Sequence, residues 1–122
     1  MPAKIVITRD NDPHWESGRE FTRKVVTIGR SASNSLTLDD PEKWISRRHA
    51  ELKKIGSEYF ICDCGSSNAT YLNRQPLLPH RPQLLHEGDT IKIGHYTLTC
   101  VRFYETGKDS LRLSAEAVTS DR

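Results

Sequence analysis

Short runs of alternating apolar and polar residues recur along most of the chain, and turn-forming residues separate them. The runs are centred on Ile5 and Ile7, Leu36 and Leu38, Ala50 and Leu52, and Ile91 and Ile93. Such alternation places every second side chain on one face of a β-strand. No helical periodicity is sustained for three turns before residue 104. The pattern therefore predicts an all-β fold, an antiparallel β-sandwich.

Three further features refine this prediction. A run opens near Phe21 and ends at Ile28, and Gly56-Ser57 separates two runs that read as a hairpin. The last strand carries Tyr96, Leu98 and Cys100 on one face. The strict alternation breaks between Cys100 and Val101, which predicts a β-bulge there.

The length and charge of the chain limit its organisation. With 122 residues we expect one domain over residues 1–104, followed by a tail over 105–122. In that tail, Leu111 to Val118 could form a short helix, and residues 119–122 are expected to be disordered. No apolar stretch approaches the roughly 20 residues needed to cross a bilayer. The start of the chain is too short for a secretory signal. We therefore expect a cytoplasmic protein without membrane contact.

The net charge of +2 is too small and too dispersed to indicate a nucleic-acid-binding protein. The three cysteines are Cys62, Cys64 and Cys100, and we expect reduced, partly buried thiols. A metal site would need further ligands that the sequence does not place. We expect neither a metal nor a cofactor.

Three polar segments each follow a β-type run, and they carry the functional signal. They are Gly29-Arg30, Ser46-Arg47-Arg48-His49, and residues 65–70 followed by Asn73. They offer guanidinium, hydroxyl and amide donors, a set that suits the binding of an anion such as phosphate. Small residues in the third segment would let the backbone approach the anion closely.

Each segment also has a plainer structural interpretation. Arg30 could pair with Asp39 or Asp40 at the surface. Arg47 and Arg48 point in opposite directions if their segment is extended. One of them could then face a ligand while the other faces solvent or an acidic side chain.

A catalytic interpretation is weaker. His49 begins a strand, where a histidine more often ties a loop together by hydrogen bonds than acts in catalysis. Ser46, His49 and Asp63 resemble a catalytic trio only superficially, because no Gly-x-Ser-x-Gly sequence surrounds the serine. No paired carboxylates or nucleotide-binding loop is evident. We therefore expect no enzymatic activity.

Four fragments occur in a characteristic order: IGRSASNSLTLDDP at 28–41, ISRRHAEL at 45–52, CGSSNATYLN at 64–73 and EGDTIKIG at 87–94. Together they resemble the forkhead-associated (FHA) domain, a phosphothreonine-binding β-sandwich. The resemblance implies about 10–11 strands, with the ligand site in loops at one end of the sandwich. It also implies that the partner is a phosphothreonine-containing protein or peptide, bound in signalling or assembly.

The same resemblance assigns expected roles to individual residues. Arg30 and Ser46 match the main phosphate contacts of the family, and Arg47 matches a further one. Ser67 matches a hydroxyl that bonds the phosphate, and Asn68 matches the residue that grips the peptide backbone. The positions that shape or brace the loops are matched by Gly29, His49, Gly65, Thr70 and Asn73.

Two residues are unusual for the family. Ala69 stands where the family usually has glycine, so a positive φ there would be strained. Trp44 is large for its position. We expect it to pack against the end of the sandwich, with a place in the wall beside the peptide as the alternative.

Two alternative functions stay open from the sequence. One is a phosphate-independent protein-interaction scaffold. The other is self-association, in which a phosphorylated Thr119 in the tail occupies the site of the same or a neighbouring molecule.

Overall fold

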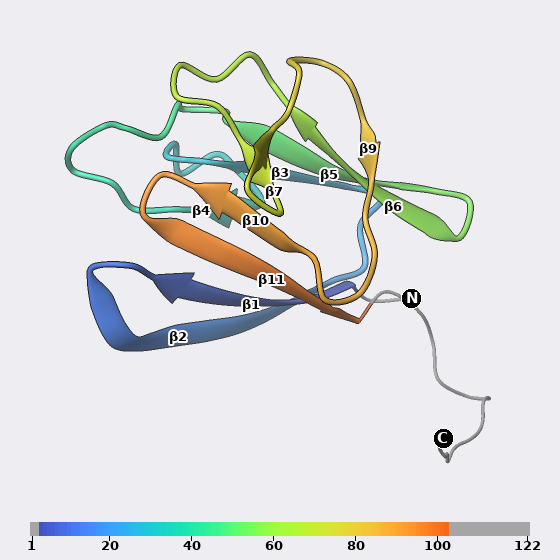
Figure 1. Cartoon of the computed structure of the whole chain (residues 1–122), viewed down its shortest axis with the longest axis horizontal. Helices are drawn as coiled ribbons and strands as arrows, with labels where there is room; N and C mark the ends of the chain where they lie inside the picture. The colour runs from blue at the N-terminus through green and yellow to red at the C-terminus, as the bar shows by residue number, and fades with distance from the viewer. Residues whose placement is uncertain (1–2, 103–122) are drawn as a thin grey trace.

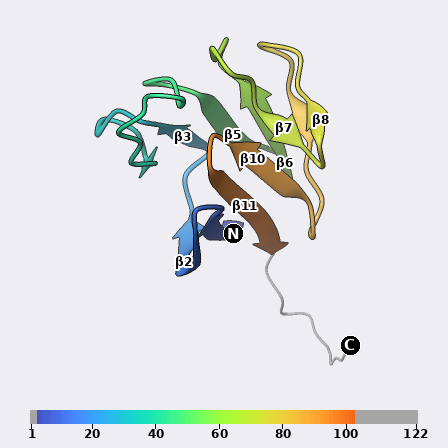
Figure 2. The same cartoon turned by 60° about the vertical axis from the view of Figure 1, so that its left-hand side comes forward.

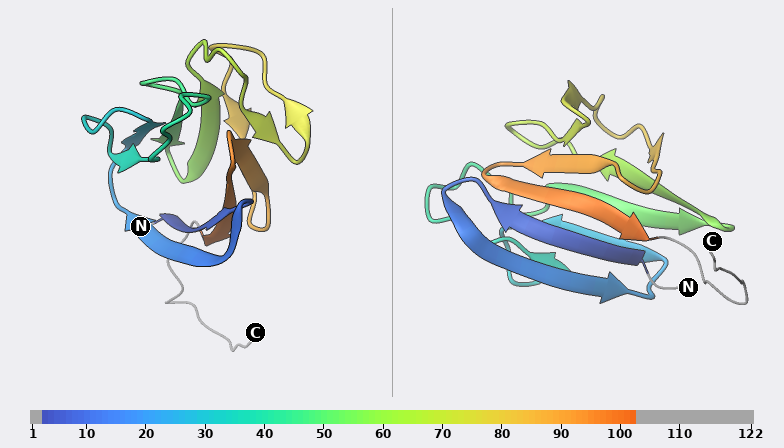
Figure 3. Two further views of the ribbon diagram at one scale, coloured as in Figure 1. Left: turned by 90° about the vertical axis from the view of Figure 1, so that its left-hand side faces the viewer. Right: turned by 60° about the horizontal axis from the view of Figure 1, so that its bottom comes forward.

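Two β-sheets packed face to face make up the part of the chain that the computed structural model describes, residues 3–102 (Figure 1). One sheet has six strands in the order β2 (Asp12–Phe21), β1 (Ala3–Arg9), β11 (Tyr96–Arg102), β10 (Thr90–Ile93), β7 (Tyr71–Leu72) and β8 (Gln75–Pro76). The other has five in the order β4 (Leu36–Thr37), β3 (Val25–Gly29), β5 (Ala50–Ile55), β6 (Glu58–Asp63) and β9 (Gln83–Leu84). The right-hand view in Figure 3 shows β2, β1, β11 and β10 side by side.

Alternation along the strands builds the core between the sheets. Ile5 and Ile7 of β1 are buried, as are Leu52 of β5 and Ile61 of β6, which pair directly. Every pairing between strands is antiparallel except that of β3 with β4. The all-β sandwich predicted from the sequence is therefore confirmed, with eleven strands in the described residues.

Several local predictions are also confirmed. β5 and β6 form the expected hairpin, and Gly56 adopts a φ of 64° in its turn. Ile5 pairs with Cys100 and Lys4 pairs with Arg102, so Val101 is left without a partner. This is the predicted bulge.

One strand prediction is wrong. Phe21 ends β2 rather than opening the run toward Ile28, and β3 begins only at Val25. β2 is mostly exposed, and it pairs only with β1 at the edge of its sheet. An edge strand needs little apolar burial, so its polar sequence lacks the alternation that marks the inner strands.

The loops after β3, β4 and β6 lie at one end of the sandwich, opposite the β5–β6 turn (Figures 1 and 2). The predicted domain boundary at residue 104, the helix from Leu111 to Val118 and the disorder of 119–122 lie outside the described residues, as does Thr119. Within residues 3–102, no helix is long and apolar enough to span a membrane.

Candidate functional site

The three polar segments meet at this end of the sandwich. The Arg30 backbone N–H donates to the carbonyl oxygen of Ser46 at 3.0 Å, and Arg30 Nε donates to the carbonyl oxygen of Ile45 at 2.9 Å. Ser46 Oγ accepts a hydrogen bond from the backbone N–H of Ser67 at 3.1 Å. Ser46 therefore connects the first segment to the third. We call this group of loops the binding rim: residues 29–31, 44–49 and 64–70.

Gly29 allows the first two segments to approach closely. A Cβ atom at this position would lie 2.2 Å from the carbonyl oxygen of Arg47, which is far inside van der Waals contact. Asn34 adds a second connection, because its Nδ2 donates to the carbonyl oxygens of Ser31 at 2.8 Å and Arg47 at 2.6 Å. The role of Asn34 was not predicted, although it lies within the first matched fragment.

The two neighbouring arginines have different environments. Arg48 lies 3.6 Å from Glu51, so it faces an acidic side chain. Arg47 is exposed, and its guanidinium group has no hydrogen bond or ion pair within residues 3–102. Arg30 is half-buried and pairs with neither Asp39 nor Asp40. Arg30 and Arg47 therefore keep guanidinium N–H groups that no described residue uses.

His49 is completely buried and holds two loops together. Its Nδ1 accepts from the Ser46 backbone N–H at 3.1 Å, so its Nε2 carries the proton and donates to the Ala69 carbonyl oxygen at 2.8 Å. Burial lowers the pKa of His49, which favours the same neutral form. His49 does not contact the Ser46 hydroxyl, so the geometry gives no proton relay from that serine.

Asp63 organises the third segment, a role that the sequence did not reveal. Its carboxylate, which is 1% exposed, accepts from the backbone N–H groups of Gly65 and Ser66, both at 3.0 Å. It also accepts from the hydroxyl groups of Ser66 and Thr70, the latter at 2.7 Å. Burial acts to raise the pKa of Asp63, but these hydrogen bonds outweigh it and lower the pKa below its usual value. The adjoining Gly-Ser-Ser sequence is the one signal that could have indicated this role.

The remaining predicted residues take distinct positions. Gly65 has a φ of 79°, and Thr70 is fully buried against Asp63. Ser67 is exposed at the rim. Asn73 lies away from the rim, where its side chain joins the β7–β8 turn to Asp89 at 3.0 Å and to the Thr90 backbone N–H at 3.0 Å.

The expectation that Trp44 packs against the sandwich is wrong, because this side chain is 52% exposed. Asn68 Nδ2 donates to the carbonyl oxygen of Trp44 at 2.8 Å, so the backbone of Trp44 lies beside the Asn68 amide group at the rim. The site thus gains an exposed aromatic surface next to an amide group.

Ala69 has a φ of 68°, in the left-handed region that favours glycine. We expect Ala69→Gly to relieve this strain and to raise the free energy of unfolding by about 0.5–1 kcal/mol, less the entropy that glycine adds to the unfolded chain. Peptide affinity at the rim should be unchanged or tighter. Urea denaturation and isothermal titration calorimetry would measure the two effects, and a clear loss of affinity would contradict the expectation.

The cysteines are all free, and their thiols are poor nucleophiles. Burial raises the pKa of Cys64 to about 11 and that of Cys100 to about 12. Within residues 3–102, no group of three or more His, Cys, Asp or Glu side chains is placed to hold a metal ion.

The chain is similar to one family model and to several known proteins. The family model described as FHA domain matches residues 26–94. The oxoglutarate dehydrogenase inhibitor of Corynebacterium jeikeium is 38% identical over 96 residues, a match that covers 79% of this chain and 62% of that protein. The glycogen accumulation regulator GarA of Mycolicibacterium smegmatis is 40% identical over 96 residues, with 79% and 56% covered. The chain therefore spans less than two thirds of the length of these relatives.

Solved structures show the same fold. Mycobacterium tuberculosis EmbR in complex with a low-affinity phosphopeptide is 25% identical, with a TM-score of 0.69 over 85% of this chain and 26% of that one. The N-terminal FHA domain of Rad53p from S. cerevisiae, in complex with a phosphothreonine peptide, is 21% identical, with a TM-score of 0.71 over 83% of this chain and 93% of that one.

Proposed function

The chain belongs to the FHA domain family, the phosphothreonine-binding β-sandwiches, and we propose that its binding rim holds a phosphothreonine peptide through Arg30, Ser46, Arg47, Ser67 and Asn68. The observation that supports this proposal is that the backbone N–H groups of Arg30 and Ser67 both bond Ser46, at its carbonyl oxygen and its hydroxyl group. Donors from three separate loops can then reach one anion.

The unused donors of the rim suit a phosphate group. A phosphothreonine carries about −1.5 to −2 charges and three strong acceptor oxygens near neutral pH. Arg30 Nε donates to the Ile45 carbonyl oxygen. This bond fixes the plane of the guanidinium group and leaves its terminal N–H groups for the phosphate. The Ser46 hydroxyl accepts from Ser67, so its own proton is free to be donated.

Asn68 suits the peptide backbone. One N–H of its amide is held by the Trp44 carbonyl oxygen, which orients the group. The second N–H and the amide oxygen remain for a peptide carbonyl and a peptide N–H. The exposed Trp44 ring supplies apolar surface beside them. This part of the rim would contact residues next to the phosphothreonine.

The expected affinity is moderate. Each charge-assisted hydrogen bond contributes about 1.5–3 kcal/mol, so losing the phosphate should weaken binding by about a thousandfold or more. The contact area between a short peptide and the rim is small, so we expect micromolar affinity, a binding free energy of about −8 kcal/mol. Phosphorylation of the partner would then act as a switch.

The biological setting is part of the same proposal. Two relatives carry the names of an inhibitor and a regulator, and we place this chain in the same class: a non-enzymatic protein that controls a partner by binding it. The free cysteines are consistent with the cytoplasm. The binding domain would occupy residues 1–104. Residues 105–122 would form a tail whose Thr119, once phosphorylated, could bind the rim of the same or a neighbouring molecule.

Matched peptides that differ at a single residue test the function. We expect the phosphothreonine form to bind about tenfold more tightly than the phosphoserine form, because the extra methyl group fills apolar space near Asn68. The unphosphorylated threonine form should show no measurable binding. Isothermal titration calorimetry gives all three affinities. Equal binding of the phosphorylated and unphosphorylated forms would instead support a phosphate-independent scaffold.

A further inference from the structure

Arg9, the last residue of β1, carries a positive charge that the binding rim does not use. Its guanidinium carbon lies 4.1 Å from the centre of the Trp15 ring and 5.5 Å from that of Tyr96. The two rings meet edge to face, with centroids 6.1 Å apart. Arg9 Nε is buried without a hydrogen-bond partner, and within residues 3–102 the guanidinium group forms no ion pair. The aromatic rings therefore hold a cation whose charge is not neutralised.

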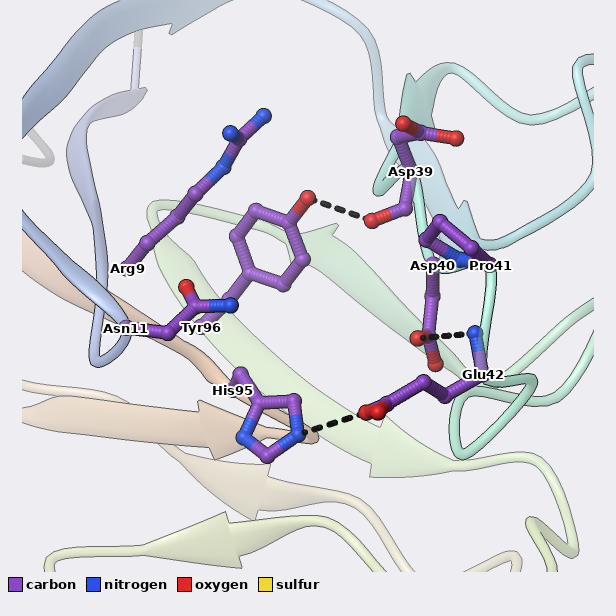
Figure 4. Close-up of a pocket in the computed structure, with 8 residues that line it drawn as sticks. All are labelled: Arg9, Asn11, Asp39, Asp40, Pro41, Glu42, His95 and Tyr96. Carbon is purple, nitrogen blue, oxygen red and sulfur yellow. Dashed lines mark hydrogen bonds and ion pairs between the residues drawn. The ribbon is translucent and has the colours of Figure 1, made fainter.

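Two pockets adjoin this cation, and they share Arg9, Asp39 and Tyr96. The larger, of about 460 Å³, lies among the β1–β2 turn, residues 39–42 and the β10–β11 turn (Figure 4). The smaller, of about 120 Å³, lies between β2 and β4, which are the edge strands of the two sheets. The shared residues make the two pockets neighbours around one cation.

The polar groups of the larger pocket are mostly satisfied within the protein. His95 Nε2 lies 3.3 Å from Glu42 Oε1, and the Tyr96 hydroxyl donates to the Asp39 carbonyl oxygen at 2.6 Å (Figure 4). The Asp40 carboxylate accepts from the backbone N–H groups of Ile45 at 2.8 Å and Glu42 at 3.2 Å. Because His95 neutralises Glu42 only when it is protonated, and Asp40 is bonded by backbone N–H groups alone, this pocket holds one cation, Arg9, and three carboxylates, those of Asp39, Asp40 and Glu42.

The smaller pocket shifts this balance toward positive charge. It adds Arg19, whose guanidinium carbon lies 5.5 Å from the centre of the Phe21 ring, and the hydroxyl groups of Ser17 and Thr37. Two guanidinium groups and the Ser17 hydroxyl group then line one small opening beside the single carboxylate of Asp39, while the Thr37 hydroxyl donates to the Ser31 carbonyl oxygen at 3.3 Å. This is the donor set of an oxyanion site.

We propose that the opening between β2 and β4 is a second anion site, which binds a carboxylate side chain from an acidic segment of the phosphoprotein partner. We call it the β2–β4 site, lined by Arg9, Ser17, Arg19 and Thr37. It rests on the proposed function, because the same partner occupies the rim. Arg9 is the main contact, since its stacking on Trp15 and Tyr96 fixes its position before the ligand arrives.

The β2–β4 site and the rim flank the same segment of the chain. Asp39 borders the second site, while Ile45 and Ser46 border the rim. The Asp40 carboxylate bonds the Ile45 N–H, and the Ile45 carbonyl oxygen accepts from Arg30. One ligand can therefore engage both sites if a linker passes around residues 39–46, and its gain in affinity should depend on linker length.

The two tryptophans report on the two sites separately. Trp15 lies at the β2–β4 site and Trp44 at the rim, and they are the two tryptophans of the chain. In ¹H–¹⁵N spectra, tetraglutamate should shift the indole signal of Trp15. A short phosphothreonine peptide should shift that of Trp44. An unmoved Trp44 signal would contradict the proposed function, whereas an unmoved Trp15 signal would contradict the second site alone.

Calorimetry measures the coupling between the sites. A library-selected phosphothreonine peptide is compared with the same peptide joined to tetraglutamate by Gly-Ser linkers of increasing length. We expect the best extension to raise affinity about three- to tenfold, the size of one partly screened charge contact. Arg9→Gln should remove this gain without changing the affinity for the unextended peptide. Arg74→Gln, at the opposite edge of the same sheet, is the charge-matched control and should keep the gain.

Two more variants, Asp39→Asn and Arg19→Gln, provide independent checks of the calorimetric result. Asp39→Asn should increase the gain, because it removes the one carboxylate that faces the two arginines. If Arg9→Gln does not fold, the exposed Arg19→Gln should reduce the gain instead. A gain that persists in Arg9→Gln, or that Arg74→Gln abolishes equally, would overturn the β2–β4 site. An equal Trp15 shift with a generic DNA oligonucleotide would assign the surface to nucleic acid and overturn it as well.

Discussion

Arg30→Ala is expected to weaken phosphothreonine-peptide binding by at least about a hundredfold. Arg30 should supply two charge-assisted hydrogen bonds, each contributing about 1.5–3 kcal/mol, and their joint loss amounts to about 3–6 kcal/mol. The effect should be large because the bond from Arg30 Nε to the Ile45 carbonyl oxygen holds the guanidinium group in place before the ligand arrives. Isothermal titration calorimetry with the library-selected phosphopeptide measures the loss.

Arg48→Ala is the matched control. It removes an arginine side chain from the second segment of the rim, but the Arg48 guanidinium group pairs with Glu51, so it is not one of the unused donors. We expect its affinity to stay within about threefold of the wild type, since an exposed ion pair contributes little. Thermal unfolding should show that both variants keep the fold. Similar losses in the two variants would mean that general positive charge, rather than Arg30, attracts the peptide.

Arg30→Lys separates charge from geometry. Lysine keeps the positive charge but lacks the planar fork that bonds a phosphate through two N–H groups. It also cannot donate to the Ile45 carbonyl oxygen and the phosphate in the same fixed arrangement. We therefore expect an affinity between those of the wild type and Arg30→Ala. If the lysine variant bound the peptide as tightly as the wild type, Arg30 would act only as a point charge.

Periodicity predicted the inner strands of the fold, and it failed for β2. Apolar and polar residues alternate around Ile5, Leu52 and Ile91, because each sheet buries one face in the core. β2 carries Asp12, Glu16 and Glu20, since an edge strand with one neighbour has little apolar surface to bury. Strand prediction from alternation therefore works where burial enforces it.

The residues of the candidate site were predicted by family resemblance, as were the loop-bracing residues His49 and Thr70, whereas the bracing roles of Asn34 and Asp63 were not. Arg30 and Ser46 follow from matched fragments, and the structure places both at one end. The bond partners of Asn34 and Asp63 are carbonyl oxygens, N–H groups and hydroxyls of other loops, so no spacing in the sequence reveals them. The bracing roles of Asn34 and Asp63 depend on three-dimensional closure, which single-sequence patterns do not encode.

Two of the five non-glycine residues with a positive φ in residues 3–102 flank the contact between Trp44 and Asn68. Lys43, directly before Trp44, has a φ of 61°, and Ala69, directly after Asn68, has a φ of 68°. The hydrogen bond from Asn68 to the Trp44 carbonyl oxygen lies between these two left-handed residues. Non-glycine residues adopt this conformation at a cost, which the surrounding structure must offset. The bonds of Asp63 and His49 to the same loops supply that support.

Asp63→Asn should therefore have the largest effect on stability, a loss of about 2–4 kcal/mol in the free energy of unfolding at neutral pH. The amide group would place an N–H₂ donor against the donors that now surround the carboxylate, from Gly65, Ser66 and Thr70. Peptide affinity should fall too, because these bonds hold the third loop of the rim. Urea denaturation gives the stability, and Glu58→Gln, an exposed acid on the same strand, is the charge-matched control.

The pH dependence identifies the charge as the cause. The pKa of Asp63 is lower in the folded state than in the unfolded chain, where it is about 3.9. Its contribution to stability is therefore complete well above pH 4 and is lost as the pH falls through the folded-state pKa. The difference in unfolding free energy between wild type and Asp63→Asn should narrow on acidification below about pH 4. A difference that stays constant down to pH 3 would mean that lost packing, rather than the hydrogen-bonded charge, destabilises the variant.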